Sequence, residues 1–175
     1  MPRNIEIKAR LPSPGALAAL EARAAALADR GPERIHQDDT FFRCAAGRLK
    51  LRAFSAGAGE LIFYRRPDVQ GPRTAFYVRT PTADPDGLRE ALTLAHGQAG
   101  RVVKERTLYL VGRTRVHLDR VAGLGEFMEL EVVLDEAEPE DGGLREAHDL
   151  MARLGVAPAQ WVDCAYVDLL RGRGG

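Results

Sequence analysis

Charged side chains recur at every second position in several short stretches of this sequence. In the stretch NIEIKAR near the N-terminus, Asn4, Glu6 and Lys8 alternate with apolar residues. Such alternation is typical of a β-strand, whose successive side chains point to opposite faces of a sheet. Because the same spacing returns along the chain, we expect several strands that each carry one charged face and one apolar face.

The basic members of these faces concentrate on the middle strands. They are Arg48, Lys50, Arg52, Arg66, Arg79, Lys104, Arg106 and Arg115. Guanidinium groups suit phosphate oxygens because they donate paired, charge-assisted hydrogen bonds, while lysine offers a compact point charge. If these cations share an enclosed surface, they need an anionic partner, since burying each one alone costs several kcal/mol. The pattern therefore favours a polyanionic ligand.

The acidic members form a second group, made of Glu6, Asp119, Glu129 and Glu131. Carboxylate oxygens are the ligands that hard divalent ions such as Mg²⁺ or Mn²⁺ prefer, with water or phosphate completing the coordination shell. Taken together, the acidic and basic groups describe a site for a metal ion and a polyphosphate.

An ordinary solvated sheet is the simpler explanation for any one of these strands, because charged outer faces are common. Solvent-facing surfaces usually intersperse the two signs of charge, however, whereas here bases and acids are segregated along the chain. We therefore predict that the charged faces line the interior of a small barrel or tunnel.

The elements that must position these residues follow from the same alternation and from turn-forming connections. We expect strands over residues 4–10, 33–42, 48–54, 60–66, 73–80, 101–112, 114–121 and 127–134. Helices are expected over residues 13–30, 84–96 and 142–155, with a short one over 165–170. The predicted fold class is α+β, an eight-stranded antiparallel sheet closed into a β-tunnel with helices packed on the outside.

Composition limits the classes of function. The 175 residues are most simply one domain covering residues 1–175, and 25 basic residues balance 25 acidic ones, so nucleic acid is not an expected partner. Cys44 and Cys164 lack the spacing of a metal site, and no apolar run reaches the length of a membrane span. We expect a cytoplasmic protein without a membrane partner, and the sequence is also compatible with a homodimer.

The sequence resembles the CYTH, or triphosphate tunnel, superfamily, which is named for class IV adenylate cyclases and thiamine triphosphatases. The family's Glu-x-Glu-x-Lys motif is matched by NIEIK at Glu6 and Lys8. The resemblance continues, in order, through QDDTFF, GRLKLR, ELIFYRRPD, VVKER, TRVHLD, GLGEFMELEVV and AYVDLL, and so covers almost the whole chain. All three lysines of the chain fall in these motifs.

This resemblance implies a small-molecule triphosphate substrate and one or two divalent metal ions, Mg²⁺ or Mn²⁺. It implies metal ligands at Glu6, Asp119, Glu129 and Glu131. It implies triphosphate-binding roles for Lys8, Arg48, Lys50, Arg52, Arg66, Arg79, Lys104, Arg106 and Arg115. Among these residues, Glu6, Lys8, Lys104 and Arg106 are the implied catalytic groups.

One position departs from the family pattern. The first glutamate of the motif is Asn4 here, and an asparagine offers a neutral oxygen without a negative charge. We therefore expect one metal ion to bind more weakly, which puts a two-metal mechanism in question.

Two further polar residues, Asp39 and His117, each allow more than one role. Asp39 shares a strand face with Gln37 and could reach the tunnel mouth, although a structural or surface role is favoured. His117 lies on the charged face between Arg115 and Asp119, where it could transfer a proton or orient Asp119.

Three functions remain open at this point. Attack by water would make the protein a hydrolase of tripolyphosphate, thiamine triphosphate or a nucleoside triphosphate. Attack by the ribose 3′-hydroxyl of ATP would make it an adenylate cyclase that releases pyrophosphate. A non-catalytic polyphosphate or nucleotide-binding protein is the third alternative. Hydrolysis is slightly favoured because, unlike cyclisation, it does not also require a pocket for the base and the sugar.

Overall fold

A computed structural model describes residues 3–12, 14–55, 57–65 and 73–172 of the chain. Within these ranges there are eight strands and four α-helices. The strands are β1 (Arg3–Arg10), β2 (Arg30–Phe42), β3 (Arg48–Ala53), β4 (Gly59–Arg65), β5 (Arg73–Thr82), β6 (Gln98–Val111), β7 (Thr114–Val121) and β8 (Gly125–Leu134). The helices are α1 (Ala16–Leu27), α2 (Pro85–His96), α3 (Glu140–Leu154) and α4 (Tyr166–Arg171).

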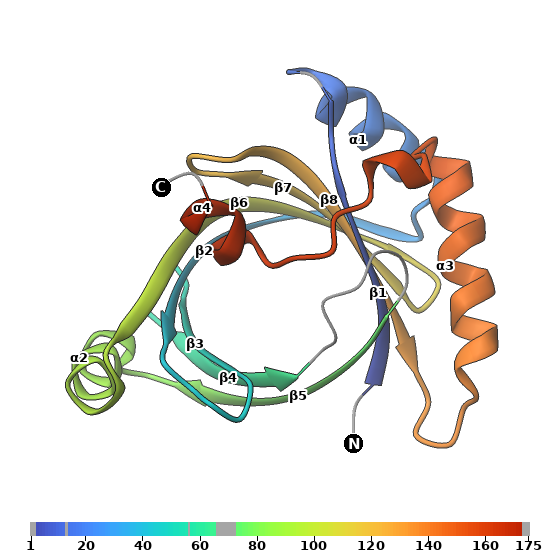
Figure 1. The fold of residues 1–175 in the computed structure, drawn as a ribbon. Helices are drawn as coiled ribbons and strands as arrows, with labels where there is room; N and C mark the ends of the chain where they lie inside the picture. The colour runs from blue at the N-terminus through green and yellow to red at the C-terminus, as the bar shows by residue number, and fades with distance from the viewer. Residues whose placement is uncertain (1–2, 13, 56, 66–72, 173–175) are drawn as a thin grey trace.

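The strands form one antiparallel sheet that closes on itself in the order β1-β5-β4-β3-β2-β6-β7-β8. Figure 1 looks along this ring, with β3, β4 and β5 on one side and β1, β7 and β8 on the other. Closure depends on β1, which pairs with β5 along one edge and with β8 along the other. The predicted fold, including the outside position of the helices, is confirmed.

The hydrophobic core lies outside the ring rather than inside it. Ile5 and Ile7 on β1, and Leu130 and Val132 on β8, are fully buried and point away from the tunnel. They pack beneath α3, which covers β1 and β8 (Figure 1), and α1 packs beside it. Each such side chain contributes about 1.5–3 kcal/mol of hydrophobic free energy. The interior is therefore left for polar groups.

Close packing of α3 on the sheet depends on a glycine. A Cβ placed on Gly143 would lie 2.6 Å from the Leu134 side chain and 3.0 Å from Ile5. The helix ends at Gly155, which adopts a left-handed conformation with φ of 73°. Glycine accepts that conformation without steric cost, as is common at helix ends.

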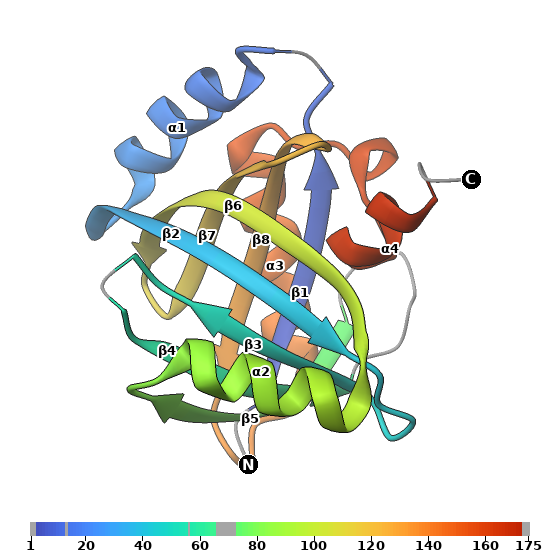
Figure 2. The ribbon, with the colours of Figure 1, turned by 90° about the vertical axis from the view of Figure 1, so that its left-hand side faces the viewer.

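The other two helices lie against the opposite wall and at one end of the ring. Figure 2 shows α2 in front of the β2–β3 side of the sheet. It begins where the Asp84 carboxylate accepts a hydrogen bond from the Gly87 backbone N–H, which is a common way to cap the N-terminus of a helix. The short helix α4 lies at one end of the ring, next to β6 (Figure 1).

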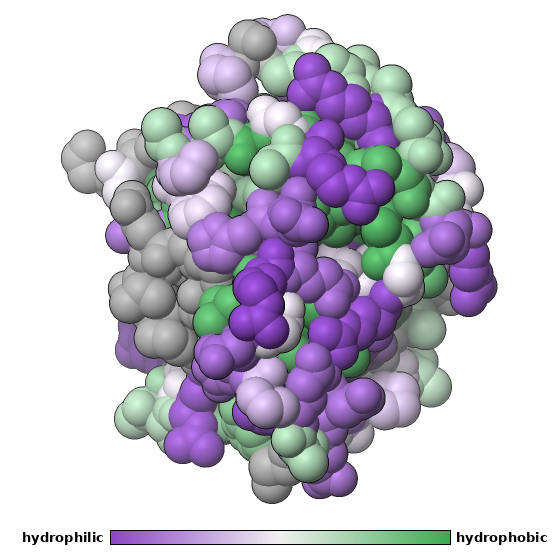
Figure 3. All heavy atoms as spheres, turned by 90° about the vertical axis from the view of Figure 1, so that its right-hand side faces the viewer, coloured by the Kyte–Doolittle hydropathy of each residue, from purple (hydrophilic) through white to green (hydrophobic). Residues whose placement is uncertain are grey.

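The surface over α3 mixes charged and apolar side chains, shown in purple and green in Figure 3. The homodimer with which the sequence is compatible stays a prediction. Across the described ranges, none of the helices has both the length and the apolar character required to cross a membrane.

The outside core predicts a large effect for a single truncation beneath α3. Leu130→Ala should lower the free energy of unfolding by about 3 kcal/mol, because it leaves a cavity between sheet and helix. The matched control is Leu94→Ala on α2, whose side chain is 82% exposed, and it should change stability by no more than about 0.5 kcal/mol. Urea unfolding measures both values, and equal effects at the two positions would contradict an outside core.

Candidate active site

The closed sheet encloses a cavity of about 350 Å³ whose lining comes from all eight strands and α4. Its polar lining consists of Asn4, Glu6, Lys8, Gln37, Asp39, Lys50, Arg52, Tyr64, Tyr77, Arg79, Lys104, Arg106, Arg115, His117, Glu129, Glu131 and Tyr166. Most of the residues singled out from the alternation of the strands therefore meet in one interior space.

A buried carboxylate organises the basic side of the cavity. The Asp39 carboxylate accepts hydrogen bonds from Lys50 Nζ at 2.7 Å and from Arg52 Nε and Nη2 at 2.8 and 2.9 Å. Asp39 is only 1% exposed, and although burial opposes its charge, Arg52 and Lys50 hold its pKa well below the usual value. The surface role considered from the sequence is wrong, because Asp39 is buried in the cavity wall, where it pairs with Lys50 and Arg52.

Burial and neighbouring positive charges disfavour the protonated form of the lysines on this side. Burial, together with the neighbouring Arg52, lowers the pKa of Lys50 to about 8. Burial and Arg106 likewise lower the pKa of Lys104 well below its ordinary value. An anion entering the cavity would relieve this repulsion, because an opposite charge within a few ångströms favours the protonated amine.

A second ion pair closes the wall between β6 and β7. Arg106 donates two hydrogen bonds of 2.7 Å to the Asp119 carboxylate, and the Tyr166 hydroxyl donates a third at 2.8 Å. Asp119 is fully buried behind Arg106 and does not line the cavity. Burial opposes its charge, but Arg106 and Lys104 still lower the pKa of Asp119 to about 2. The observed contacts of Asp119 thus orient Arg106.

The segment after α3 brings Tyr166 to this position. It runs beside β1, where Ala9 forms an isolated bridge with Trp161 and the Val162 N–H donates to the Lys8 carbonyl. Lys8 Nζ then donates to the Cys164 carbonyl at 3.2 Å and lies 4.3 Å from the centre of the Tyr166 ring. Cation–π attraction of this kind positions an ammonium group without neutralising it.

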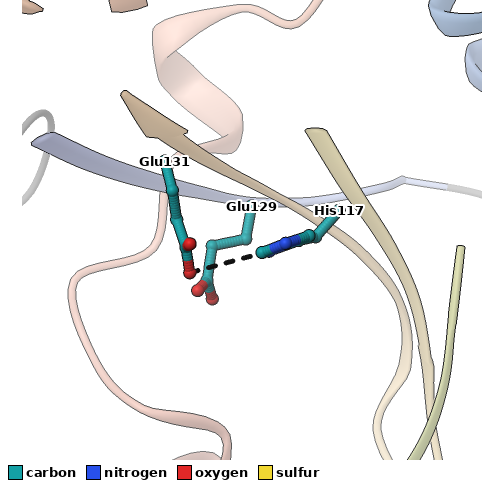
Figure 4. Close-up of side chains that lie close together, drawn as sticks. All are labelled: His117, Glu129 and Glu131. Atoms are coloured by element: carbon teal, nitrogen blue, oxygen red, sulfur yellow. Dashed lines mark ion pairs between the residues drawn. The ribbon is translucent and has the colours of Figure 1, made fainter. Parts of the chain in front are cut away.

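The acidic side of the cavity is built by three adjacent strands. In the register of β1 and β8, Glu6 pairs with Glu131, and in that of β7 and β8, His117 pairs with Glu129. His117, Glu129 and Glu131 each offer a donor atom within 4.8 Å of the others (Figure 4). Burial, reinforced by Glu129 and Glu6, raises the pKa of Glu131 to about 7. A cation is the natural partner for such a cluster.

His117 is the neutral member of this group. Burial and the charge of Arg106 lower its pKa well below the ordinary value. Its Nδ1 lies 3.6 Å from Glu131 Oε1, the dashed line in Figure 4, which is too long for a hydrogen bond. A neutral imidazole keeps a lone pair available for a metal ion.

The donor set fits a divalent metal ion. Carboxylates of Glu6, Glu129 and Glu131 supply hard oxygen ligands, and His117 can add a nitrogen. Donors that share one Mg²⁺ at about 2.1 Å lie at most about 4.2 Å apart, so small side-chain movements would complete the site.

The remaining predicted residues lie in different places. Arg79 and Arg115 line the cavity, where Arg79 is paired with Glu60 at 2.7 Å and Arg115 lies 3.5 Å from Glu131. Arg48 instead lines a second cavity outside the tunnel and is bound to Asp168 of α4 at 2.6 Å. Arg66 falls outside the described residues.

The sequence did not predict that Tyr166 enters the tunnel, and it left open the roles of Asp39 and His117. The motif AYVDLL predicts a short helix and contributes to the family resemblance, but nothing in its own pattern shows that a tyrosine enters the tunnel. Asp39 and His117 were signalled by their alternation with other inward-facing residues. The alternation places His117 on the charged face, whereas for Asp39 a structural or surface role is favoured over a place at the tunnel mouth.

The structure is a closed antiparallel ring with cationic and carboxylate side chains segregated in its interior. A family model described as CYTH domain matches residues 2–166. The chain therefore belongs to the CYTH domain family.

Similarity to individual proteins supports the same fold. The PH1012 protein from Pyrococcus horikoshii OT3 superposes with a TM-score of 0.82 at 23% identity, covering 95% of this chain and 98% of that one. The Hippeastrum protein HpAC1, described as an adenylyl cyclase candidate with a dominant triphosphatase activity, gives 0.65 at 22% identity, covering 98% and 96%.

One curated relative is similar in sequence. It is the adenylate cyclase CyaB of Aeromonas hydrophila, 30% identical over 99 residues, or 56% of this chain and 52% of that protein. The match thus spans about half the length of the curated relative.

The buried pair of Arg106 and Asp119 leads to a stability prediction. Asp119→Ala should lower the free energy of unfolding by about 3–5 kcal/mol, because it leaves a buried guanidinium without its partner. The control is Asp38→Ala, which removes a partner of the more exposed Arg101 and should cost about 1 kcal/mol or less. If urea unfolding finds the Asp119 variant as stable as the control while its metal affinity collapses, Asp119 acts as a metal ligand instead.

Proposed function

We propose that this protein is a divalent-metal-dependent enzyme that hydrolyses a triphosphate bound inside the tunnel. The observation that carries the proposal is the division of one buried cavity into a cationic wall and a carboxylate wall. A polyphosphate with a metal ion on its oxygens presents both charges at once, so it can neutralise both walls together.

The residues of the basic wall are the proposed phosphate-binding groups. Lys50 and Arg52 of β3 and Lys104 and Arg106 of β6 line one space. In such a site the protein contributes mainly position and field, stabilising charge on the phosphoryl oxygens as the bond breaks. Asp39 and Asp119 keep the two guanidinium groups of this wall fixed in orientation before the substrate arrives.

The acidic wall is the proposed metal site. A bound Mg²⁺ or Mn²⁺ would polarise the phosphoryl oxygens as a Lewis acid and orient the chain of phosphates. Glu6, Glu129 and Glu131 would hold that ion. Lys8, 3.6 Å from Glu129, lies between the two walls, where it can bind a phosphate oxygen next to the metal ligands.

Adenylate cyclase activity is the second candidate, and two observations favour it. The curated relative with 30% identity is named adenylate cyclase CyaB. In addition, a second cavity of about 650 Å³ lies next to the tunnel and shares Phe41 and Tyr64 with it. That cavity offers room for a nucleoside beside a triphosphate.

A panel of substrates separates these functions. ATP, tripolyphosphate and thiamine triphosphate are each incubated with the protein and Mg²⁺ or Mn²⁺, while phosphate, pyrophosphate and cyclic AMP are followed. Release of phosphate from a triphosphate supports the hydrolase, and cyclic AMP with equal pyrophosphate supports the cyclase. Tight binding of all three compounds without turnover would contradict both and leave a binding protein.

The lowered pKa of Lys50 predicts how binding depends on pH. In the free protein Lys50 is charged below about pH 8 and loses its proton above it. Affinity for tripolyphosphate in EDTA should therefore fall as pH rises, by roughly tenfold between pH 7 and 9, where only about a tenth of the amine stays charged.

The matched control for this prediction is Lys50→Arg, which keeps a charge throughout this range. Titration calorimetry should find a clearly shallower decline for this variant, while Lys104 and the ligand's own ionisation affect both proteins alike. Identical pH profiles for the two proteins would show that Lys50 does not contact the phosphates.

A further inference from the structure

The proposed metal site contains a histidine that the carboxylate motif does not account for. Resting on the proposed function, we infer that His117 is a direct metal ligand. The site then has mixed nitrogen and oxygen donors and favours divalent transition ions over Mg²⁺ more strongly than its carboxylates alone would.

The sheet register brings His117 to the metal ligands. It stands directly opposite Glu129 on the neighbouring strand, and Glu131 lies one inward-facing position further along β8. In Figure 4 the imidazole edge and the two carboxylates converge on one space. Their donor atoms lie within 4.8 Å of one another without any change of backbone.

A buried nitrogen without a partner is the second, independent observation. His117 is 5% exposed, and its Nδ1 has no hydrogen-bond partner among the residues that the structure describes. An unpaired buried polar atom costs about 1–3 kcal/mol, so it marks a place where a partner from outside the chain is expected.

Other uses of the imidazole are less consistent with the contacts. The Asp119 carboxylate, which His117 could have oriented, is already held by Arg106 and by the Tyr166 hydroxyl. The Glu131 carboxylate stays 3.6 Å from Nδ1, too far for a hydrogen bond. A metal ion between these groups would satisfy both.

Asn4 explains why a nitrogen ligand is useful here. It stands in the cavity wall where the family motif has a glutamate, and its Oδ1 is also buried without a partner in the described part of the chain. Another carboxylate would add repulsion to Glu6, Glu129 and Glu131, whereas an imidazole adds a ligand without adding negative charge. Imidazole suits later first-row ions such as Co²⁺, while Mg²⁺ prefers oxygen alone.

The test measures coordination directly, without turnover. Pulsed EPR of Mn²⁺ bound to the substrate-free protein should show coupling to a histidine nitrogen. That coupling should disappear in His117→Asn and persist in His36→Asn, the control, because His36 pairs with Glu105 on the outside of the tunnel. Calorimetry should find that His117→Asn weakens Co²⁺ binding on the order of tenfold, with a change below about threefold for Mg²⁺.

A second variant covers the case in which His117→Asn fails to fold. Replacing His36, His96 and His148 by asparagine leaves His117 as the remaining histidine of the four in the chain. Nitrogen coupling in that triple variant supports the inference. Absence of coupling in the folded wild-type protein, or equal losses of Co²⁺ and Mg²⁺ affinity in His117→Asn, overturns it.

These outcomes are separate from those of the proposed function. A protein that hydrolyses triphosphates but shows only oxygen coordination keeps the proposed function and loses this inference. A protein that binds Mn²⁺ through His117 but neither binds nor cleaves any triphosphate keeps this inference and loses the proposed function.

Discussion

Ionised groups taken out of water cost several kcal/mol each unless opposite charges or hydrogen bonds compensate them, and this constraint shapes the tunnel. The guanidinium of Arg52 is paired with Asp39, and that of Arg106 with Asp119. These pairs neutralise part of the positive charge of the cavity and hold the two guanidinium groups in fixed orientations. Lys50 and Lys104, whose pKa values burial lowers, and Glu131, whose pKa burial raises, show that compensation is incomplete. The uncompensated part is what a metal-bound polyphosphate would supply.

The rest of the fold offsets the free-energy cost of such a charged interior. Since the apolar sides of β1 and β8 are covered by α1 and α3, the hydrophobic free energy is gained outside the ring. A smaller apolar cluster around Phe127 and Tyr166 fastens α4 to the end of the tunnel. Tyr166 thereby links packing to the site, because its ring packs edge-to-face against Phe127 and its hydroxyl donates to Asp119.

Much of this arrangement could be predicted from alternation alone. The period of two in NIEIK, RLKLR and FMELEVV assigns Glu6, Lys50 and Glu131 to a common face, and the structure confirms the closed antiparallel ring with outside helices. Pairing across strands could not be predicted, because it depends on register between segments far apart in sequence. Asp39 and Arg52 are register partners, as are Arg106 and Asp119.

The central claim is that the two charged walls hold one ligand between them. Diffraction from crystals grown with tripolyphosphate and Mn²⁺, recorded at the manganese absorption edge, tests it most directly. The account predicts an anomalous peak between His117, Glu129 and Glu131, with phosphates against Lys50, Arg52 and Lys104. Phosphates bound only on the outer surface, with no manganese among these carboxylates, would contradict it.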